Sequence, residues 1–95
     1  MATIIIPTPL RKFTNQQTRI KVGGENIQQS INELISEFPD LKKNLLEDNG
    51  KIRNYVNIFI GNKDIRDLSN EHTLVEHDTV ISIVPAIAGG SSNQL

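Results

Sequence analysis

An amphipathic segment near the middle of the chain constrains the fold more than any other feature. Its apolar residues recur at the spacing of one helix face: Ile27, Ile31, Leu34, Ile35 and Phe38. Asn26 stands where an N-cap belongs, and Pro39 prevents the helix from continuing. The sequence therefore predicts a single main helix with one face to bury.

Strand-like segments lie before and after this helix. Runs that are β-branched, or that alternate apolar and polar residues, predict strands over 3–6, 18–22, 55–60 and 79–84. A Gly61-Asn62 hairpin turn leads into a short strand over 63–66, and residues 39–46 predict a short second helix. This order predicts an α+β fold in which one main helix crosses a mixed sheet of four to five strands.

Composition excludes several classes of protein. The 95-residue chain suffices for one domain, its formal net charge is −1, and it contains no cysteine. The lack of cysteine excludes disulfides and thiolate chemistry, and the lack of a basic stripe argues against nucleic-acid binding. The apolar run Ile4-Ile5-Ile6 is too short for a signal peptide or a membrane span. We expect a cytoplasmic protein that binds neither nucleic acid nor a membrane.

One helix covers one face of a sheet, so the other face is left for solvent or for a partner. Placing the polar residues Asn57 and Ser82 outside buries their neighbours on the same strands: Val56, Ile58, Ile60, Ile81 and Ile83. The outward residues then include Phe59 and Val84. Taking Ile5 of the first strand as outward too, an assumption that no polar neighbour fixes, we interpret Ile5, Phe59 and Val84 as a partner-docking face. The alternative is that they are ordinary exposed apolar side chains.

The last strand leads into a tail of small residues. Pro85 cannot donate to a sheet ladder, so we expect the domain to span residues 1–84 and a flexible tail to span 85–95. Small uncharged residues and two glycines follow the proline: Ala86, Ile87, Ala88, Gly89 and Gly90. The six residues from Pro85 to Gly90 extend roughly 20 Å, which is enough to enter a narrow active site of a partner.

Four segments carry a resemblance to a known family: 6–11 (IPTPLR), 56–60 (VNIFI), 63–66 (KDIR) and 84–90 (VPAIAGG). Over residues 2–90 the chain resembles the ubiquitin-like β-grasp sulfur carriers of the ThiS and MoaD type. Within that family it is most similar to the carrier that serves cysteine biosynthesis. The resemblance implies a ubiquitin-like β-grasp fold, and its most specific part is the Gly-Gly pair directly after the last strand.

The resemblance implies a function that depends on Gly90. In this family an adenylating enzyme uses ATP to convert the terminal glycine carboxylate into an acyl-adenylate, and sulfur then displaces AMP to leave a thiocarboxylate. The carrier delivers this sulfur inside a biosynthetic enzyme, such as a PLP-dependent cysteine synthase. The resemblance therefore implies a carrier that is not an enzyme, has no catalytic residue or metal, and holds no permanently bound cofactor.

Residues 91–95 follow the glycine pair and depart from the simplest family pattern. While Gly90 is in a peptide bond with Ser91, there is no carboxylate to adenylate. We interpret the chain as a proform that is cut between Gly90 and Ser91, because similar carriers are processed by zinc metalloproteases of the JAMM type. The alternative is that these five residues are a linker remnant.

Other residues invite weaker interpretations. His72 and His77 stand beside acidic residues, but a spacing of five does not place both on one face of a helix, so we predict no metal site. Gly23-Gly24 lacks the rest of a phosphate-binding motif and is interpreted as a turn. Arg11 and Arg66 could pair with acidic groups on a partner, although surface arginines are more often only solvated.

Three functions remain open from the sequence. The first, which we favour, is the sulfur carrier. The second is a ubiquitin-like protein modifier that is joined through Gly90 to lysines on target proteins. The third is a non-covalent interaction module that does not use its glycines.

Overall fold

The structure is a computed structural model that describes residues 1–85. Its strands are β1 (Ala2–Ile5), β2 (Arg19–Val22), β3 (Val56–Ile60), β4 (Lys63–Asp64) and β5 (Val80–Pro85). Its α-helices are α1 (Ile27–Glu37) and α2 (Lys42–Leu45). Short 3-10 helices occur at Thr8–Phe13, Pro39–Leu41, Ile65–Asp67 and Asn70–His72. The order of strands around the main helix is the predicted one.

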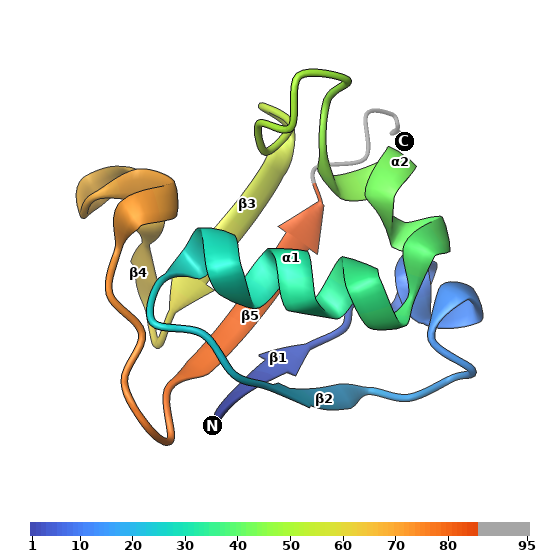
Figure 1. Cartoon of the computed structure of the whole chain (residues 1–95), viewed down its shortest axis with the longest axis horizontal. Coiled ribbons are helices and arrows are strands. Elements are labelled where there is room, and N and C mark those ends of the chain that lie inside the picture. Colours follow the sequence, from blue (N-terminus) through green and yellow to red (C-terminus); the bar gives the residue numbers. More distant parts are fainter. Residues whose placement is uncertain (86–95) are drawn as a thin grey trace.

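The strands form one five-stranded sheet in the order β2-β1-β5-β3-β4 (Figure 1). β5 occupies the centre, where it runs parallel to β1 and antiparallel to β3. The outer pairs, β1 with β2 and β3 with β4, are antiparallel. The predicted mixed sheet with one main helix is therefore confirmed, and the strand that leads into the tail is its central strand.

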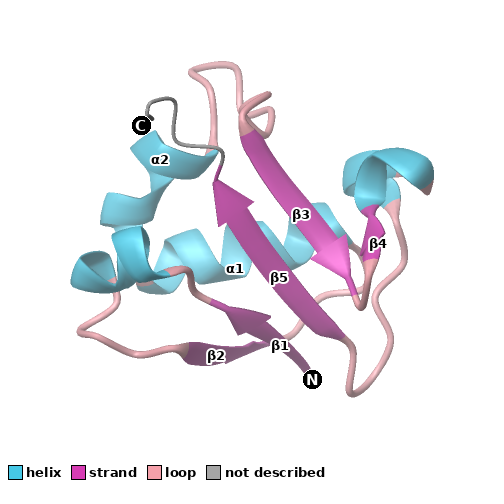
Figure 2. Ribbon diagram, turned by 180° about the vertical axis from the view of Figure 1, so that it is seen from behind, coloured by secondary structure: helices cyan, strands magenta, loops and turns pink. Residues whose placement is uncertain are grey.

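The helix α1 crosses one face of this sheet, and Figure 2 shows the opposite face, across which no described helix passes. At the start of α1 the Asn26 side chain accepts a hydrogen bond of 2.8 Å from the Gln29 backbone N–H, as expected of an N-cap. Pro39 begins the next 3-10 helix, so α1 ends before it. The predicted stripe faces the sheet: Ile27, Ile31, Leu34 and Phe38 are buried, and Ile35 is partly buried.

The core lies between α1 and the inner face of the sheet. The sheet supplies buried residues from four strands: Ala2, Ile4, Ile20, Val22, Val56, Ile58, Ile81 and Ile83. Leu41 and Leu45, from the predicted second helical segment, close one end of this core. Asn57 and Ser82 therefore set the inward and outward alternation of their strands as expected. Ile60 is only partly buried because its strand ends there, at the Gly61 turn.

Two strands end earlier than predicted. The first strand ends at Ile5, although the Ile6 N–H still donates to the Thr18 carbonyl at 2.9 Å. The short strand predicted over 63–66 stops after Asp64, because the Asp64 carboxylate accepts the Arg66 backbone N–H at 2.8 Å and caps a 3-10 helix. This turn ends the pairing with β3 after two residues.

The last strand extends one residue further than predicted. Pro85 belongs to β5 and lies opposite Val56 of β3. A proline can occupy the final position of a strand, because no further pair of the ladder follows that would need the N–H group that proline lacks. The sheet therefore reaches the first residue of the predicted tail.

Candidate functional site

The open face of the sheet brings two of the predicted docking residues into one row. Ile5 of β1 lies opposite Ser82 of β5, and Ser82 lies opposite Phe59 of β3. Neighbouring strands are about 4.8 Å apart, so Ile5 and Phe59 are separated by roughly 10 Å across the small serine. Both side chains are partly buried. The row is therefore apolar at both ends, with the small Ser82 side chain between them.

Val84 lies on the same face, between this row and the tail. It follows Ser82 by two residues on β5, so both side chains point the same way, and 47% of Val84 is exposed. Its neighbour across the ladder is Asn57 of β3. The structure thus brings together Ile5, Phe59 and Val84, and Pro85 follows immediately at the edge of this surface.

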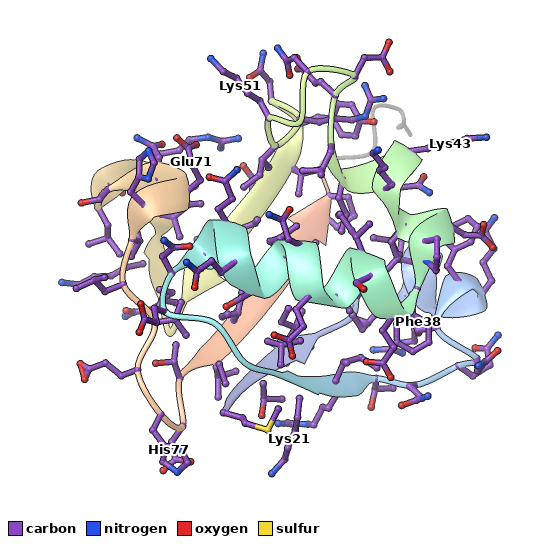
Figure 3. All side chains as sticks on the ribbon, in the orientation of Figure 1. Lys21, Phe38, Lys43, Lys51, Glu71 and His77 are labelled. Atoms are coloured by element: carbon purple, nitrogen blue, oxygen red, sulfur yellow. The ribbon has the colours of Figure 1, made fainter. Side chains whose placement is uncertain are left out.

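Basic side chains border the open face on the β2 side. Arg19 lies opposite Ile5, and Lys21 lies opposite Thr3, which places both on the open face. Both are exposed, and Figure 3 shows Lys21 at the outer edge of the sheet. The apolar surface is therefore flanked by positive charge along one side.

Arg66 is anchored within the protein, a role that the sequence analysis did not identify. Its guanidinium donates to the Asn57 side-chain oxygen, to the Asn54 carbonyl at 2.6 Å and to the Val56 carbonyl at 3.2 Å. Its Nη1 also lies 3.6 Å from the Asp64 carboxylate. No local sequence pattern reveals this role, because the contacts join residues that are 9 and 12 positions apart.

Arg11 also has an internal role. Its Nε donates to the Ile6 carbonyl at 3.0 Å, at the point where β1 has ended. The nearby Thr14 side chain is buried, and its hydroxyl donates to the Gln17 carbonyl at 2.9 Å. These bonds fix the connection between β1 and β2, so Arg11 is not simply a solvated surface charge.

The two histidines do not come together as metal ligands. His72 contacts Glu71 at 3.5 Å, whereas His77 contacts Asp78 at 3.4 Å and the N-terminal amine at 2.8 Å. Figure 3 shows His77 and Glu71 at separate parts of the molecule. Across residues 1–85 no group of three potential metal ligands is present.

Gly23-Gly24 forms a turn between β2 and α1. Gly24 has a φ of +112°, which a residue with a Cβ rarely adopts. The Gly23 N–H donates to the Glu33 carboxylate at 2.8 Å, so the donor that a phosphate group would need is already used by a side chain of α1. The interpretation as a turn is therefore supported by its geometry.

A hollow of about 280 Å³ lies on the helix side of the molecule. Gln28 and Asn32 of α1 line one wall, and Lys51 and Ile52 of the loop after α2 line the other. Ile5, Phe59 and Val84 do not line it. The hollow is therefore separate from the predicted docking face.

The remaining predicted site residues follow Pro85. Ala86, Ile87, Ala88, Gly89, Gly90 and Ser91 lie outside the described residues. The tail role and the processing position therefore stay predictions. In the described part of the chain, no helix combines the length and the apolar character needed to cross a membrane.

Comparison with known proteins identifies the family. Residues 4–90 match the ThiS family. The chain belongs to the ThiS family. This confirms the resemblance inferred from the sequence, and the family match ends at Gly90, directly before residues 91–95.

The curated relatives of this ThiS-family chain are carrier proteins. The sulfur carrier protein CysO of Mycobacterium tuberculosis is 29% identical over 90 residues, which cover 93% of this chain and 97% of the relative. CysO of Mycobacterium bovis matches equally well. These relatives are small carriers and not enzymes, in agreement with the prediction made for this chain.

Solved structures of such carriers share the fold. The Amycolatopsis orientalis BexX/CysO complex matches with a TM-score of 0.86 and 26% identity, covering 95% of this chain and all of that chain. Mycobacterium tuberculosis CysO matches with a TM-score of 0.83 and 26% identity, over 92% of this chain and all of that one. The predicted ubiquitin-like β-grasp fold is therefore confirmed.

Proposed function

We propose that this ThiS-family chain is a sulfur carrier that bears a thiocarboxylate on Gly90 and delivers sulfur to a biosynthetic enzyme. The observation that carries the proposal is the match of residues 4–90 to the family, together with 29% identity to CysO over nearly the whole length of both chains. Because CysO is named a sulfur carrier, the same role is the simplest one for a relative with the same fold.

The chemistry requires a free carboxylate at Gly90. That carboxylate attacks the α-phosphorus of ATP on an adenylating enzyme, which releases pyrophosphate and forms an acyl-adenylate. A hydrosulfide ion then attacks the acyl carbon, AMP leaves, and a thiocarboxylate remains. The ionised sulfur adds to the electrophilic carbon of a conjugated carbon–carbon double bond in the acceptor's substrate, and the neighbouring carbon takes up a proton. Hydrolysis of the resulting thioester restores the Gly90 carboxylate and leaves the sulfur on the product as a thiol. No oxidant or reductant is needed.

Residues 91–95 must be removed before this sequence can begin. The family match ends at Gly90, which supports a cleavage position between Gly90 and Ser91. A JAMM-type zinc metalloprotease is the expected processing enzyme. ATP is a substrate of the adenylating enzyme, and the carrier contributes only its terminal glycine to that reaction.

The open sheet face is the proposed docking surface for these partners. Ile5, Phe59 and Val84 lie on one side of the sheet, next to the strand end from which the tail begins. A partner that covers this apolar surface would hold the body outside its active site while the tail reaches inward. Because Pro85 is paired in β5, the five residues from Ala86 to Gly90 supply a reach of roughly 17 Å when extended, which suits a buried reaction centre.

The acceptor that we propose is a PLP-dependent cysteine synthase or a related enzyme of sulfur metabolism. Similarity to CysO, whose name denotes a sulfur carrier, supports this choice. The adenylating enzyme and the acceptor would use the same tail in turn. Their shared requirement is a channel that is narrow enough to exclude side chains larger than those of the tail.

Intact mass spectrometry of the chain isolated from its native cell tests the proposal. We expect a species that ends at Gly90 and is heavier than the free acid by the difference between sulfur and oxygen. Purified protein ending at Gly90 should gain the same mass with ATP, sulfide and the adenylating enzyme. A control ending at Gly89 shows whether the position of the terminal carboxylate matters.

Other outcomes would favour the alternative functions. Branched peptides that join Gly90 to lysines of target proteins, without any sulfur-bearing form, would favour the protein modifier. A chain that still ends at Leu95, with neither a truncated nor a sulfur-bearing form, would contradict the carrier and favour a non-covalent module.

A further inference from the structure

Most of the outer edge of β3 is not covered by another strand in the described part of the chain. β4 pairs only with Phe59 and Ile60, so no strand among residues 1–85 lies beside the edge from Val56 to Ile58. Unpaired carbonyls at a sheet edge need another donor. The Arg66 guanidinium supplies it, donating from one nitrogen to the carbonyls of Asn54 and Val56.

The residues that Arg66 contacts lie opposite the end of β5. Val56 lies opposite Pro85, and Asn57 lies opposite Val84. Hydrogen-bonded pairs alternate along an antiparallel ladder, and the Gly61 N–H donates to the Val80 carbonyl at 3.4 Å. By this alternation Asn57 and Val84 also form a hydrogen-bonded pair. Arg66 therefore holds β3 at the last two pairs before the tail.

The geometry requires an arginine. The two terminal nitrogens of the guanidinium bind different partners, since Nη1 donates to the Asn57 side chain while Nη2 donates to the two backbone carbonyls. Asp64 lies near Nη1 and accepts the Arg66 backbone N–H, so the side chain and the backbone of Arg66 are both held. A lysine ammonium is a single point charge and cannot reproduce this fork.

We propose that Arg66 is a positioning residue that fixes the point at which the C-terminal tail leaves the sheet. Arg66 binds Val56 and Asn57 of β3, and these two residues pair with Pro85 and Val84 of β5. The consequence for sulfur transfer rests on the proposed function, but the effect on the sheet does not. Arg66 therefore acts through β3 on the tail, and no contact with a substrate is required of it.

Loss of this anchor would change the starting point of the tail. If the last two pairs open, the tail begins after Ile83, and its free length grows by two residues, or roughly 7 Å. A longer and less directed tail samples a larger volume, which lowers the effective concentration of Gly90 at a partner's active site. The chemical step itself would be unaffected once the tail is in place.

Hydrogen exchange on the free carrier tests the proposal without any partner. Arg66→Met removes the guanidinium, and Arg66→Lys keeps only the charge. Lys63→Met is the matched control, because Lys63 is an exposed cation on β4. We expect the Val84 amide to exchange about tenfold faster in Arg66→Met while the Ser82 amide of the same ladder changes little. Arg66→Lys should show a smaller acceleration.

The ratio of the Val84 exchange rate to the Ser82 exchange rate decides whether the effect of Arg66 is local to the end of β5. A purely global loss of stability would accelerate Val84 and Ser82 by the same factor, and this result would overturn the proposal. An unchanged ratio in Arg66→Met, or an equal change in Lys63→Met, would overturn it as well. If Arg66→Met does not fold, the same ratio of exchange rates is compared between Arg66→Lys and Lys63→Met.

Steady-state kinetics with the adenylating enzyme then test whether the Arg66 anchor affects adenylation of the carrier. With the adenylating enzyme, Arg66→Met should raise KM for the carrier about tenfold or less, with kcat preserved, because the carboxylate reacts normally once it is bound. A loss of kcat with unchanged KM would contradict a positioning role. A wild-type carrier that is never adenylated would instead contradict the proposed function, and the exchange result would be unaffected.

Discussion

Asn57 and Val84 lie directly opposite each other, one pair before the last described pair between β3 and β5. The Asn57 side chain also accepts a hydrogen bond from Arg66, and 47% of Val84 is exposed on the open face. One pair of residues thus connects the proposed docking surface, the Arg66 anchor and the start of the tail. Changes at this end of the sheet should therefore affect partner binding more than changes of similar size elsewhere on the surface.

Phe59→Ala is predicted to weaken docking. Removing this ring from the open face should reduce affinity for the adenylating enzyme about 10- to 100-fold, as for an aromatic side chain that a partner buries. Isothermal titration calorimetry would measure the affinity. Leu74→Ala is the control, because Leu74 is 76% exposed and lies in the connection paired with Asn26, away from the open face. Equal losses in both variants would contradict the assigned surface.

Shortening the tail is predicted to separate docking from reaction. Deleting Ala86 and Ile87 removes roughly 7 Å of reach while the whole described domain remains. Affinity for the adenylating enzyme should change little, whereas thiocarboxylate formation on Gly90, measured by intact mass, should be lost. The length-preserving double variant Ala86→Ser, Ile87→Val should still react. Full activity of the shortened carrier would show that reach is not limiting.

Ile81→Ala is predicted to destabilise the fold strongly. Ile81 is 0% exposed on the central strand, and removing such a side chain leaves a cavity, which costs about 2–5 kcal/mol. Urea denaturation would give the free energy of unfolding. Val80→Ala on the same strand should cost less than about 1 kcal/mol, because Val80 is 38% exposed on the other face. Similar costs at the two positions would contradict the assigned faces of β5.

Asn26→Ala is predicted to lower the free energy of unfolding by about 1 kcal/mol, because the Gln29 backbone N–H loses its acceptor. Asn32→Ala makes the same chemical change at an exposed position inside α1, where alanine is the better helix former. In thermal unfolding, Asn26→Ala should therefore have a lower Tm than the wild type, and Asn32→Ala should have an equal or higher Tm. The reverse order would contradict the N-cap.

Local patterns were sufficient to predict much of the fold. The spacing of the α1 stripe, Asn26 and Pro39 define the helix, because these signals act within a few residues. The polar residues Asn57 and Ser82 were sufficient to assign the faces of β3 and β5, since alternation along a strand is strict. The docking residues Phe59 and Val84 were placed on one face by the same argument, whereas the run Ile4-Ile5-Ile6 contains no polar residue that could assign Ile5 to a face.

Interactions between distant residues could not be predicted in this way. Arg66 reaches Asn54 and Asn57, which are 12 and 9 residues away, and no periodic pattern marks such a contact. β4 is short because the Asp64 side chain caps the following 3-10 helix, and this cap competes with strand pairing. The apolar Ile65 after it instead favours a longer strand in the sequence pattern. The contact between His77 and the N-terminal amine joins residues 76 positions apart.

The central position of β5 has a mechanical consequence. A partner that draws the tail into a channel pulls lengthwise on a strand that is bonded to β1 on one side and to β3 on the other. Such a load acts in shear, so many hydrogen bonds must break together before the strand slides. A strand at the sheet edge would be held by hydrogen bonds on one side only and would slide under a smaller load. The body can therefore resist traction on its own tail and remain folded while the tail is engaged.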